Sequence, residues 1–439
     1  MINKNSLFFD YKLLIAVILL SITGIVFVYS SSFSVFHDGS HLQYQKQIFF
    51  LISGFFVMWL AAFINYRKLI EHKTLIYLIT IAVLLFTLLF GKVVNNSRRW
   101  VSFGLFSIQP SEFAKISWIL VLAGWLEQLK DNLDYKALAR IFILMLVPCA
   151  LVLLQPDLGT ALIFIPITLV MIFMAGVSGK YLTAICLLLF IAGFIPLFLA
   201  YTKLVHAADN RVVDIISNHL YILITAFFFL ASALVIFIIN FSMRNLFLEN
   251  VIFFLIVTAV GLLCAVGIDI FLKPYQKERL LVFINPELKR WTSGYNIIQS
   301  VITIGSGGIF GKGITRGTQS QLGFLPEQST DFIFSLIGEE GGFILTAGIV
   351  LVFLFLLYRI FKITASAKDY PGGFIGAGIF MLFFSHIFVN IGMVIAVAPV
   401  TGLPLPFITA GGSSQWLFMF AVGMIFNIEI RRHVHTRHE

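Results

Sequence analysis

The chain has 439 residues, of which 59% are hydrophobic and only 12% are charged. A soluble protein of this length needs far more charge to cover its surface, so the composition excludes a soluble enzyme, and no nucleic-acid partner is expected. A hydrocarbon core about 30 Å thick instead requires apolar helices of roughly 20 residues. The formal net charge of +9 first indicates loops on the cytoplasmic face, where Lys and Arg are enriched.

Apolar segments of helical length follow one another along nearly the whole chain. Because a bilayer offers no water to unpaired backbone amides, these segments should be α-helices. We therefore predict an all-α polytopic membrane protein, a single domain over residues 1–439 with about twelve transmembrane helices. They are expected at residues 13–31, 47–64, 72–91, 113–128, 137–154, 159–176, 180–201, 217–240, 249–272, 331–360, 373–399 and 412–430.

The distribution of Lys and Arg predicts the orientation. With the N-terminus in the cytoplasm, most cations of the short loops lie on the cytoplasmic side, and the C-terminus lies there too. Two clusters, at 92–99 and 273–316, fall on the outer side. Long loops cross the membrane whatever their charge, but an anionic lipid head group would equally account for these cations, since Arg and Lys bind phosphate well.

An apolar pair of helices within residues 202–272 carries little chemistry. Because it adds an even number of crossings, the chain downstream keeps its side of the membrane. We predict a helical hairpin inserted into the larger domain. No internal repeat is evident, which disfavours an inverted-repeat transporter.

The polar stretch before the helix at 113–128 contains the first candidate site residues. Glu112 and Lys115 lie three residues apart, so on a helix they share a face and can pair. Ionisable residues inside a membrane are costly and are often functional. The pair is either a structural lock or part of a site, and the nearby Arg98 and Arg99 favour a site.

Two further polar stretches carry carboxylates. In the turn QPDLGT, Asp157 either caps the following helix, where an anion is favoured, or contributes to a site. Glu339 and Glu340 lie within the helix that Asp331 opens, and such adjacent acids need cations such as Lys115. We prefer a structural role for this pair over a proton site.

The longest predicted loop runs over residues 273–330 on the outer side. A structureless stretch of this length is commonly a binding or active-site element. Its glycine run, 305–313, does not match a nucleotide-binding loop, because Ser306 and Gly313 stand where the pattern needs Gly and Ser/Thr. We expect a flexible re-entrant turn there. The uncharged, Pro- and Gly-containing stretch 390–414 is predicted to be a broken segment packed within protein.

Five strings together resemble the SEDS family, named for shape, elongation, division and sporulation. They occur in the family's order, and they are SRRW with QPSEFAK, QPDLGTAL, GYNIIQSVITIGSGGIFGKG, LPEQSTDFIF with IGEE, and NIGMV followed by LPLPFITAGGSS. Each string alone is modest evidence, whereas all five in order are highly specific. The run GTQSQLGFLPEQSTDFIFS looks more like the elongation branch of the family than the division branch.

The resemblance implies a peptidoglycan glycosyltransferase of the bacterial inner membrane that polymerises lipid II during cell elongation and shape maintenance. It implies a class B penicillin-binding protein, a transpeptidase, as partner. It also implies a ten-helix core, so that the hairpin within 202–272 supplies the two extra helices. The residues that match the family strings directly are Glu112, Lys115, Asp157, Glu327 and Asp331.

One position departs from the family pattern. The family's essential aspartate lies in a DPxxDPxGxGY-like string, and the corresponding text here is NPELKRWTSGY. Asn285 therefore replaces the first aspartate, and Lys289 occupies the essential position. Glu287 is the nearest acid. Either Glu287 acts in its place, or another carboxylate does, or the chain polymerises poorly.

In the implied reaction, a sugar hydroxyl of lipid II attacks the anomeric carbon of the growing chain and expels a polyprenyl diphosphate. A carboxylate acts as general base, which typically contributes about 10²–10⁴-fold in rate, and cations stabilise the departing diphosphate. We assign catalysis to Glu287, as substitute base, with Glu112 and Lys115. Substrate binding is assigned to Arg99, Asp157, Lys273, Arg279, Glu327 and Asp331.

A divalent cation could stabilise the same negative charge, but no cluster of metal ligands stands out in the sequence. Two other functions stay open. A lipid II flippase would place Glu112, Lys115 and Glu340 along a transport path. A non-catalytic scaffold would bind and activate the transpeptidase without chemistry of its own.

Overall fold

The computed structural model describes residues 10–33, 41–94, 97–102, 104, 106–129, 133–205, 218–271, 277–278, 282–283, 285–291 and 294–434. The chain forms two compact units, Met1–Gly176 with Tyr295–Glu439, and Val177–Gly294. The first unit contains most of the predicted site residues. Glu287 and Lys289 belong to the second.

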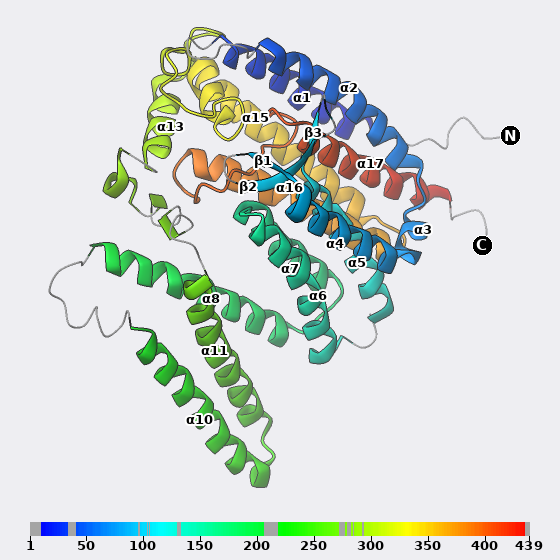
Figure 1. Cartoon of the computed structure of the whole chain (residues 1–439). Coiled ribbons are helices and arrows are strands. Elements are labelled where there is room, and N and C mark those ends of the chain that lie inside the picture. The colour runs from blue at the N-terminus through cyan, green and yellow to red at the C-terminus, as the bar shows by residue number, and fades with distance from the viewer. Residues whose placement is uncertain are drawn as a thin grey trace. The chain divides into compact units, whose positions relative to one another are not determined.

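The first unit consists of helices and one small sheet (Figure 1). Its helices are α1 (Tyr11–Ser31), α2 (His41–Phe63), α3 (Tyr66–Glu71), α4 (Lys73–Phe90), α5 (Pro110–Leu129), α6 (Tyr135–Leu154), α7 (Leu158–Met174), α13 (Tyr295–Ser306), α14 (Thr318–Gln321), α15 (Ile333–Ala365), α16 (Tyr370–Val394) and α17 (Gly412–Val434).

All twelve predicted apolar segments are helical, and the all-α polytopic fold is confirmed. Ten helices of the described residues are long and apolar enough to cross a membrane. The other two predicted segments are α5 and the shorter apolar helix α7. Helix α5 runs over 20 residues and is largely buried, so it is longer than the sequence indicated.

A three-stranded antiparallel sheet precedes α5. Its strands are β1 (Lys92–Val94), β2 (Ser97–Ser102) and β3 (Ser107–Ile108), in the order β1-β2-β3. Val94 pairs with Ser97 and Val101 with Ile108. These strands were not predicted from the sequence, because the stretch is short and polar. The sheet presents Arg99 on its central strand, and β3 leads directly into Pro110.

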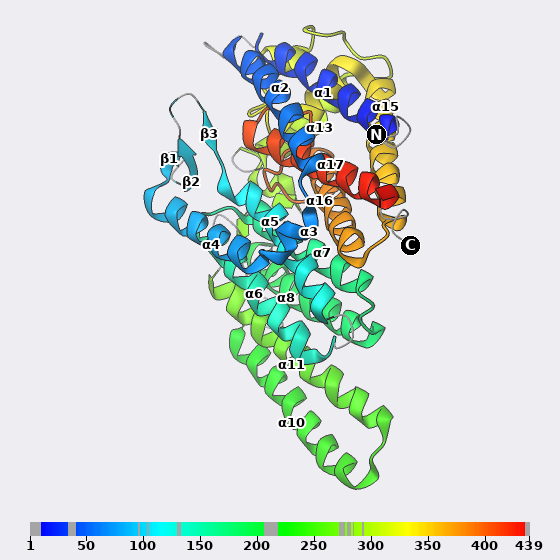
Figure 2. The ribbon, with the colours of Figure 1, turned by 90° about the vertical axis from the view of Figure 1, so that its right-hand side faces the viewer.

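Helix α17 lies in the interior of the first unit, beside α2 in both views (Figures 1 and 2). A buried aromatic cluster joins α16 to α17, with ring centroids 5.2–5.9 Å apart. It consists of Phe383 of α16, Phe418 of α17 and Phe407, which precedes α17. Between helices in a membrane, such van der Waals packing is a main source of association. The cluster holds in place the part of α16 that carries His386, a residue of the candidate site described below.

The predicted loop 273–330 is not structureless. It contains η1 (Pro286–Lys289), α13 and α14. The glycine run predicted as a flexible turn packs by backbone hydrogen bonds on α15: Phe343 N donates to Gly308 O at 2.9 Å, and Gly313 N to Glu340 O at 2.9 Å. These bonds are possible because α15 is broken at Gly342, where φ is +66°.

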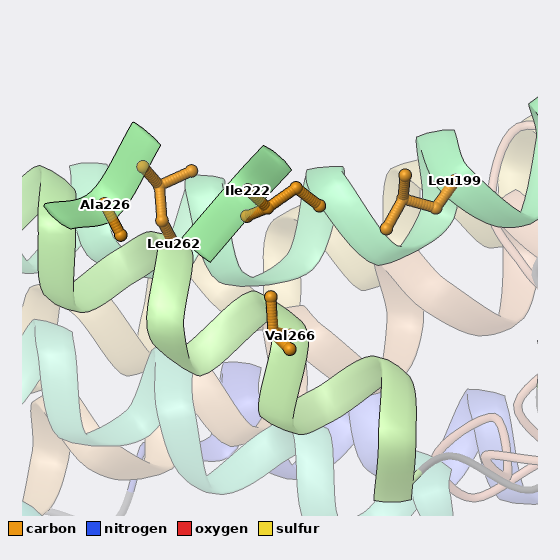
Figure 3. Packing of buried hydrophobic residues seen from close by; sticks show 5 residues of the cluster. All are labelled: Leu199, Ile222, Ala226, Leu262 and Val266. Carbon is orange, nitrogen blue, oxygen red and sulfur yellow. The ribbon is translucent and has the colours of Figure 1, made fainter. Parts of the chain in front are cut away.

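The second unit holds α8 (Gly179–Val205), α10 (His219–Met243), α11 (Leu246–Phe271) and η1. Helices α10 and α11 form the hairpin that the sequence indicated, and Arg244 ends α10 with a left-handed φ of 48°. A buried apolar cluster joins them to α8 (Figure 3), and its residues are Leu199, Ile222, Ala226, Leu262 and Val266. That the hairpin is an insertion into a ten-helix core stays a prediction.

Candidate active site

Helix α5 carries Glu112 and Lys115 into the interior of the first unit. Pro110 suits the first helical position because its missing N–H has no partner there anyway. Lys115 Nζ donates to Glu112 Oε1 at 2.9 Å, and the two side chains are 0% and 4% exposed. The predicted pairing is confirmed. An unpaired ion at this depth would be strongly destabilising, so each charge requires the other.

His386 of α16 is the second partner of the ammonium group. Lys115 Nζ lies 2.9 Å from His386 Nε2, and His386 Nδ1 lies 3.0 Å from the carbonyl oxygen of Pro404. A carbonyl can only accept, so we assign the ring proton to Nδ1, and Nε2 then accepts from Lys115. The imidazole is therefore neutral in this arrangement. The edge of the Phe418 ring contacts it, with centroids 4.9 Å apart.

Asp157 is a second buried carboxylate close to the start of α5. Its Oδ1 accepts from Thr160 N at 3.2 Å, which caps α7. Its Oδ2 accepts from Gln109 Nε2 at 2.7 Å and from Ser111 Oγ at 3.2 Å. Asp157 is thus a helix cap, one of the two predicted alternatives, and it also ties α7 to α5.

Arg99 holds the turn that leads into Asp157. Its Nε donates to the carbonyl oxygen of Gln155 at 2.9 Å, and a terminal nitrogen donates to that of Pro156. These acceptors are backbone groups, so they orient the guanidinium without neutralising its charge. Arg99 therefore brings a fixed positive charge to the turn between α6 and α7.

One irregular segment, 401–404, contacts α7, α16 and the residues that precede α15. We call it the 401–404 loop. A Cβ added to Gly159 of α7 would lie only 2.5 Å from Thr401 O, so the turn and the loop meet backbone to backbone. Asn390 Nδ2 donates to Leu403 O at 2.7 Å and to Asp331 O at 3.3 Å.

The same loop brings Asp331 into the site. Gly402 has a φ of +72°, and a Cβ there would lie 3.3 Å from Asp331 Oδ2. Pro404 O is the carbonyl that receives the proton of His386. The loop thus links Glu112, Lys115, Asp157 and Asp331, which the sequence had placed in three separate strings.

Several buried polar atoms around this loop have no hydrogen-bond partner among the described residues. They are Glu112 Oε2, Gln155 Oε1, Ser385 Oγ, Asn390 Oδ1 and Thr401 Oγ1. Leaving such an atom unsatisfied typically costs about 1–3 kcal/mol. Native proteins leave few of them, because water or a polar ligand usually supplies the partner. These atoms could therefore form hydrogen bonds with a polar ligand.

Glu327 lies at the edge of this region and is exposed. Its φ is +49°, and its carboxylate accepts from Thr330 Oγ1 at 3.0 Å. The backbone nitrogens of Thr330 and Phe332 donate to Glu327 O, so the residue shapes the turn before α15. The helix begins at Ile333, two residues later than the sequence analysis placed its start.

Glu339 and Glu340 do not reach Lys115, contrary to the expectation from the sequence. Glu339 Oε1 accepts from Lys312 Nζ at 2.7 Å, and Oε2 from Ser320 N at 3.0 Å. Ser30 Oγ of α1 lies 2.7 Å from each carboxylate oxygen of Glu340. The pair therefore joins α14, α15 and α1, and the structural role preferred from the sequence fits these contacts.

Glu287 and Lys289 lie in the second unit, on η1. Both side chains are exposed. Lys289 Nζ is 3.9 Å from Glu278 Oε1, a separation that gives only a weak attraction between exposed groups. Gly294 N donates to Lys289 O at 3.0 Å and closes the turn. Lys273 and Arg279 lie outside the described residues.

The model of the cell cycle protein family that includes FtsW, RodA and SpoVE matches residues 11–219 and 219–434. The chain belongs to this family. These are the SEDS proteins, so the resemblance read from the five strings is confirmed, and the chain is a multi-pass membrane protein.

Known SEDS proteins match this chain along almost its entire length. Peptidoglycan glycosyltransferase RodA of Treponema pallidum is 37% identical over 440 residues, which cover 97% of this chain and 98% of the relative. Stage V sporulation protein E of Bacillus subtilis is 31% identical over 431 residues, with 95% and 96% covered. A chain in a solved peptidoglycan synthase complex is 23% identical, with a TM-score of 0.66 over 97% of this chain and 98% of that one.

His386 is the main residue of the candidate site of this SEDS chain that was not predicted from the sequence. It lies 271 positions from Lys115, so no local spacing connects them. One signal was present, because His386 and Asn390 are polar, four residues apart and therefore on one face of an apolar helix. Both donate to carbonyls of the 401–404 loop.

No metal centre is evident within the described part of this SEDS chain. Its His, Cys, Asp and Glu residues there form no group of three or more that could hold an ion.

Proposed function

We propose that this SEDS chain is a peptidoglycan glycosyltransferase that polymerises lipid II into glycan strands during cell elongation and shape maintenance. The relative from Treponema pallidum, 37% identical over nearly all of both chains, carries this enzyme name. At that identity and coverage, the same reaction class is the simplest expectation. We assign the chain to cell elongation, and not to another wall-building process, because that relative is named RodA.

The observation that carries the proposal is the group of unsatisfied polar atoms around the 401–404 loop. Glu112 Oε2, Asn390 Oδ1 and Thr401 Oγ1 are buried and unpartnered among the described residues. Disaccharide hydroxyls are both donors and acceptors, and would satisfy such atoms. An apolar substrate would leave them unpaired at a cost of about 1–3 kcal/mol each.

Helix α5 also offers a surface for the lipid part of the substrate. Pro110, Phe113, Ala114 and Ser117 recur at helical spacing and line a groove of about 400 Å³ with residues of α4, β2 and β3. Glu112 and Lys115 project from the opposite face of the same helix. One helix thus separates an apolar groove suited to a polyprenyl chain from a polar cluster suited to its head group.

The proposed reaction forms one glycosidic C–O bond, breaks the C–O bond to the diphosphate and transfers one proton. A sugar hydroxyl of lipid II attacks the anomeric carbon of the growing chain, its proton passes to a carboxylate, and the polyprenyl diphosphate leaves with the bonding electrons. Glu287 is proposed as the base, and cations including Arg99, Lys273 and Arg279 as the binders of the diphosphate. Glu112 and Lys115 are proposed as catalytic residues of the first unit, with Asp157, Glu327 and Asp331 as substrate-binding residues.

The partner and location follow from the same proposal. Joined glycan strands must be cross-linked, so a class B penicillin-binding protein, a transpeptidase, is the proposed partner. The solved complex that shares this fold couples polymerization and crosslinking. We place the chain in the bacterial inner membrane with both termini in the cytoplasm, as the Lys and Arg of its short loops favour.

A non-catalytic scaffold is the second candidate, and Lys289 is the observation that favours it. A lysine at the family's essential aspartate position cannot act as a carboxylate base. A lipid II flippase is the third. Gel electrophoresis of the products formed from labelled lipid II, by the purified chain with its transpeptidase, together with a measurement of labelled lipid II transport across vesicles, separates the three. We expect glycan strands. Lipid transport without strands would identify a flippase, and neither activity would leave a scaffold.

The substitution Glu287→Gln tests the proposed base. The amide cannot accept the proton, so polymerisation should fall by about 10²–10⁴-fold, measured as glycan strands on the same gels. Glu278→Gln is the matched control, because it neutralises another carboxylate of the second unit. Near-normal strand synthesis by the Glu287 variant would remove this residue from the mechanism.

A further inference from the structure

A basic pocket lies away from the candidate active site, where three elements of the first unit meet. We call it the basic pocket. It has a volume of about 150 Å³, and its lining residues come from the start of α3, the start of α16 and the end of α17. Four of them are cations, namely Arg67, Lys368, Arg431 and Arg432.

One carboxylate, Asp369, faces these four cations, and its oxygens are already engaged. Tyr66 donates its hydroxyl to Asp369 Oδ1 at 2.7 Å, and Arg67 Nε donates to Oδ2 at 3.0 Å. Burial of the Tyr66 hydroxyl, together with this hydrogen bond, holds the pKa of Tyr66 far above its ordinary value. Tyr66 therefore remains a donor, and the pocket keeps three positive charges in excess.

Two of the pocket's arginines, Arg431 and Arg432, form hydrogen bonds to neutral groups. Arg431 Nε donates to Asn427 Oδ1 at 2.8 Å, and its guanidinium lies 5.9 Å from the centre of the Tyr66 ring. Arg432 donates to Ser366 Oγ at 2.8 Å. Lys368 is exposed and makes no hydrogen bond or ion pair to any other described residue. These contacts orient the groups and leave donors free.

Preorganised guanidinium and ammonium groups are suited to phosphate, because guanidinium N–H groups match its oxygens in pairs. A cavity of about 150 Å³ accommodates a benzene-sized molecule, so a phosphate group fits. We propose that the basic pocket binds a phosphate group, either the head group of an anionic phospholipid or a free phosphate. By the proposed orientation, this site faces the cytoplasm and is separate from the polymerisation site.

The test measures binding to the purified full-length chain in neutral detergent. Native mass spectrometry compares phosphatidylglycerol with phosphatidylcholine, and thermal unfolding compares inorganic phosphate with chloride at equal ionic strength. The test variant is Lys368→Gln with Arg432→Gln. The control variant is Lys68→Gln with Lys362→Gln, which removes the same charge from exposed positions outside the pocket. The single variant Lys368→Gln is used if the double variant does not fold.

We expect the test variant to weaken binding roughly tenfold, as loss of charge-assisted hydrogen bonds predicts, and the control variant to bind like the parent chain. Retention of phosphatidylglycerol over phosphatidylcholine identifies a lipid head group. Stabilisation by inorganic phosphate alone identifies a free phosphate. Equal weakening in both variants, or binding of neither phosphatidylglycerol nor phosphate, would overturn the proposal.

Discussion

Lys115 is the residue on which the candidate site depends. Its ammonium is fully buried between Glu112 and His386, and only this pair of acceptors makes its charge tolerable there. His386 also donates to Pro404 O. Its imidazole thus connects the 401–404 loop to Lys115. A change at His386 should therefore affect both the ion pair and the loop.

The substitution His386→Leu should destabilise the chain by about 1–3 kcal/mol, because Lys115 and Pro404 each lose a partner. His386→Gln should retain most of the stability, since an amide offers one acceptor and one donor. Thermal unfolding of the purified proteins in detergent measures the difference. Equal loss in the two variants would show that the imidazole fills space and does not link the two groups.

Local spacing explains which site residues could be predicted from the sequence. Glu112 and Lys115 pair across one helical turn, and Asp157 precedes the helix that it caps. Both contacts join residues close in sequence, so a short stretch of sequence was enough to predict them. The partners of Glu339 and Glu340 are distant in sequence. Lys312 and Ser30 lie 27 and 310 positions away, and only the tertiary fold decides that they, and not Lys115, meet these acids.

Among the elements, α15 shows how a membrane helix can be broken without loss of hydrogen bonds. At Gly342 the backbone turns to a φ of +66° and a ψ of −170°, which frees the groups of the neighbouring turn. The glycine run supplies partners: Lys312 N donates to Glu339 O at 3.0 Å, and Phe343 N donates to Gly308 O at 2.9 Å. Backbone irregularity inside a membrane is tolerated only when such groups are satisfied.

Gly342→Ala should therefore be strongly destabilising. The added Cβ would lie 2.2 Å from Gly311 N, in a conformation that L-residues rarely adopt. Gly348→Ala is the matched control on the same helix, because nothing lies within 4 Å of its Cβ, and alanine favours a helix. We expect the yield of folded Gly342→Ala protein to collapse in size-exclusion chromatography, with Gly348→Ala unchanged. Similar behaviour of the two variants would contradict the packing of the glycine run against α15.

Hydropathy made the long elements predictable, whereas short elements depended on tertiary contacts. Twelve apolar runs became twelve helices because a bilayer allows no other structure for them. The strands β1–β3 are short and polar, so their periodicity is weak. Helix α13 has clear helical periodicity, but it lies within the stretch that was read as a long loop. Their positions are set by pairing and by contact with α15, which the sequence does not show directly.

At the scale of the whole molecule, the proposed residues are divided between two units. Glu112, Lys115, Asp157 and Asp331 belong to the first unit, and Glu287 to the second. The proposed chemistry uses an exposed carboxylate of the second unit and polar residues of the first unit. It also requires the segment that precedes α15 to lie on the outer side of the membrane.

Cysteine labelling tests this topology. In a variant that lacks the native cysteines, Arg316→Cys should react with a membrane-impermeant maleimide in intact spheroplasts, and Lys68→Cys should react only after the membrane is opened. Both positions are exposed, so access to the reagent depends on the side of the membrane alone. Labelling in the reverse order would refute the outer location of the site.

The central claim is that glycan strands are built at the polar cluster beside the 401–404 loop. Measuring lipid II polymerisation after substitution of two buried carboxylates provides a direct test. Glu112→Gln and Glu340→Gln each neutralise a buried acid of the first unit, but only Glu112 belongs to that cluster. With equal amounts of folded protein and the transpeptidase partner, polymerisation of lipid II should fall roughly tenfold or more in Glu112→Gln, a change of about 1.4 kcal/mol in activation free energy. Glu340→Gln should polymerise at close to the parent rate. Equal rates in the two variants would contradict the claim.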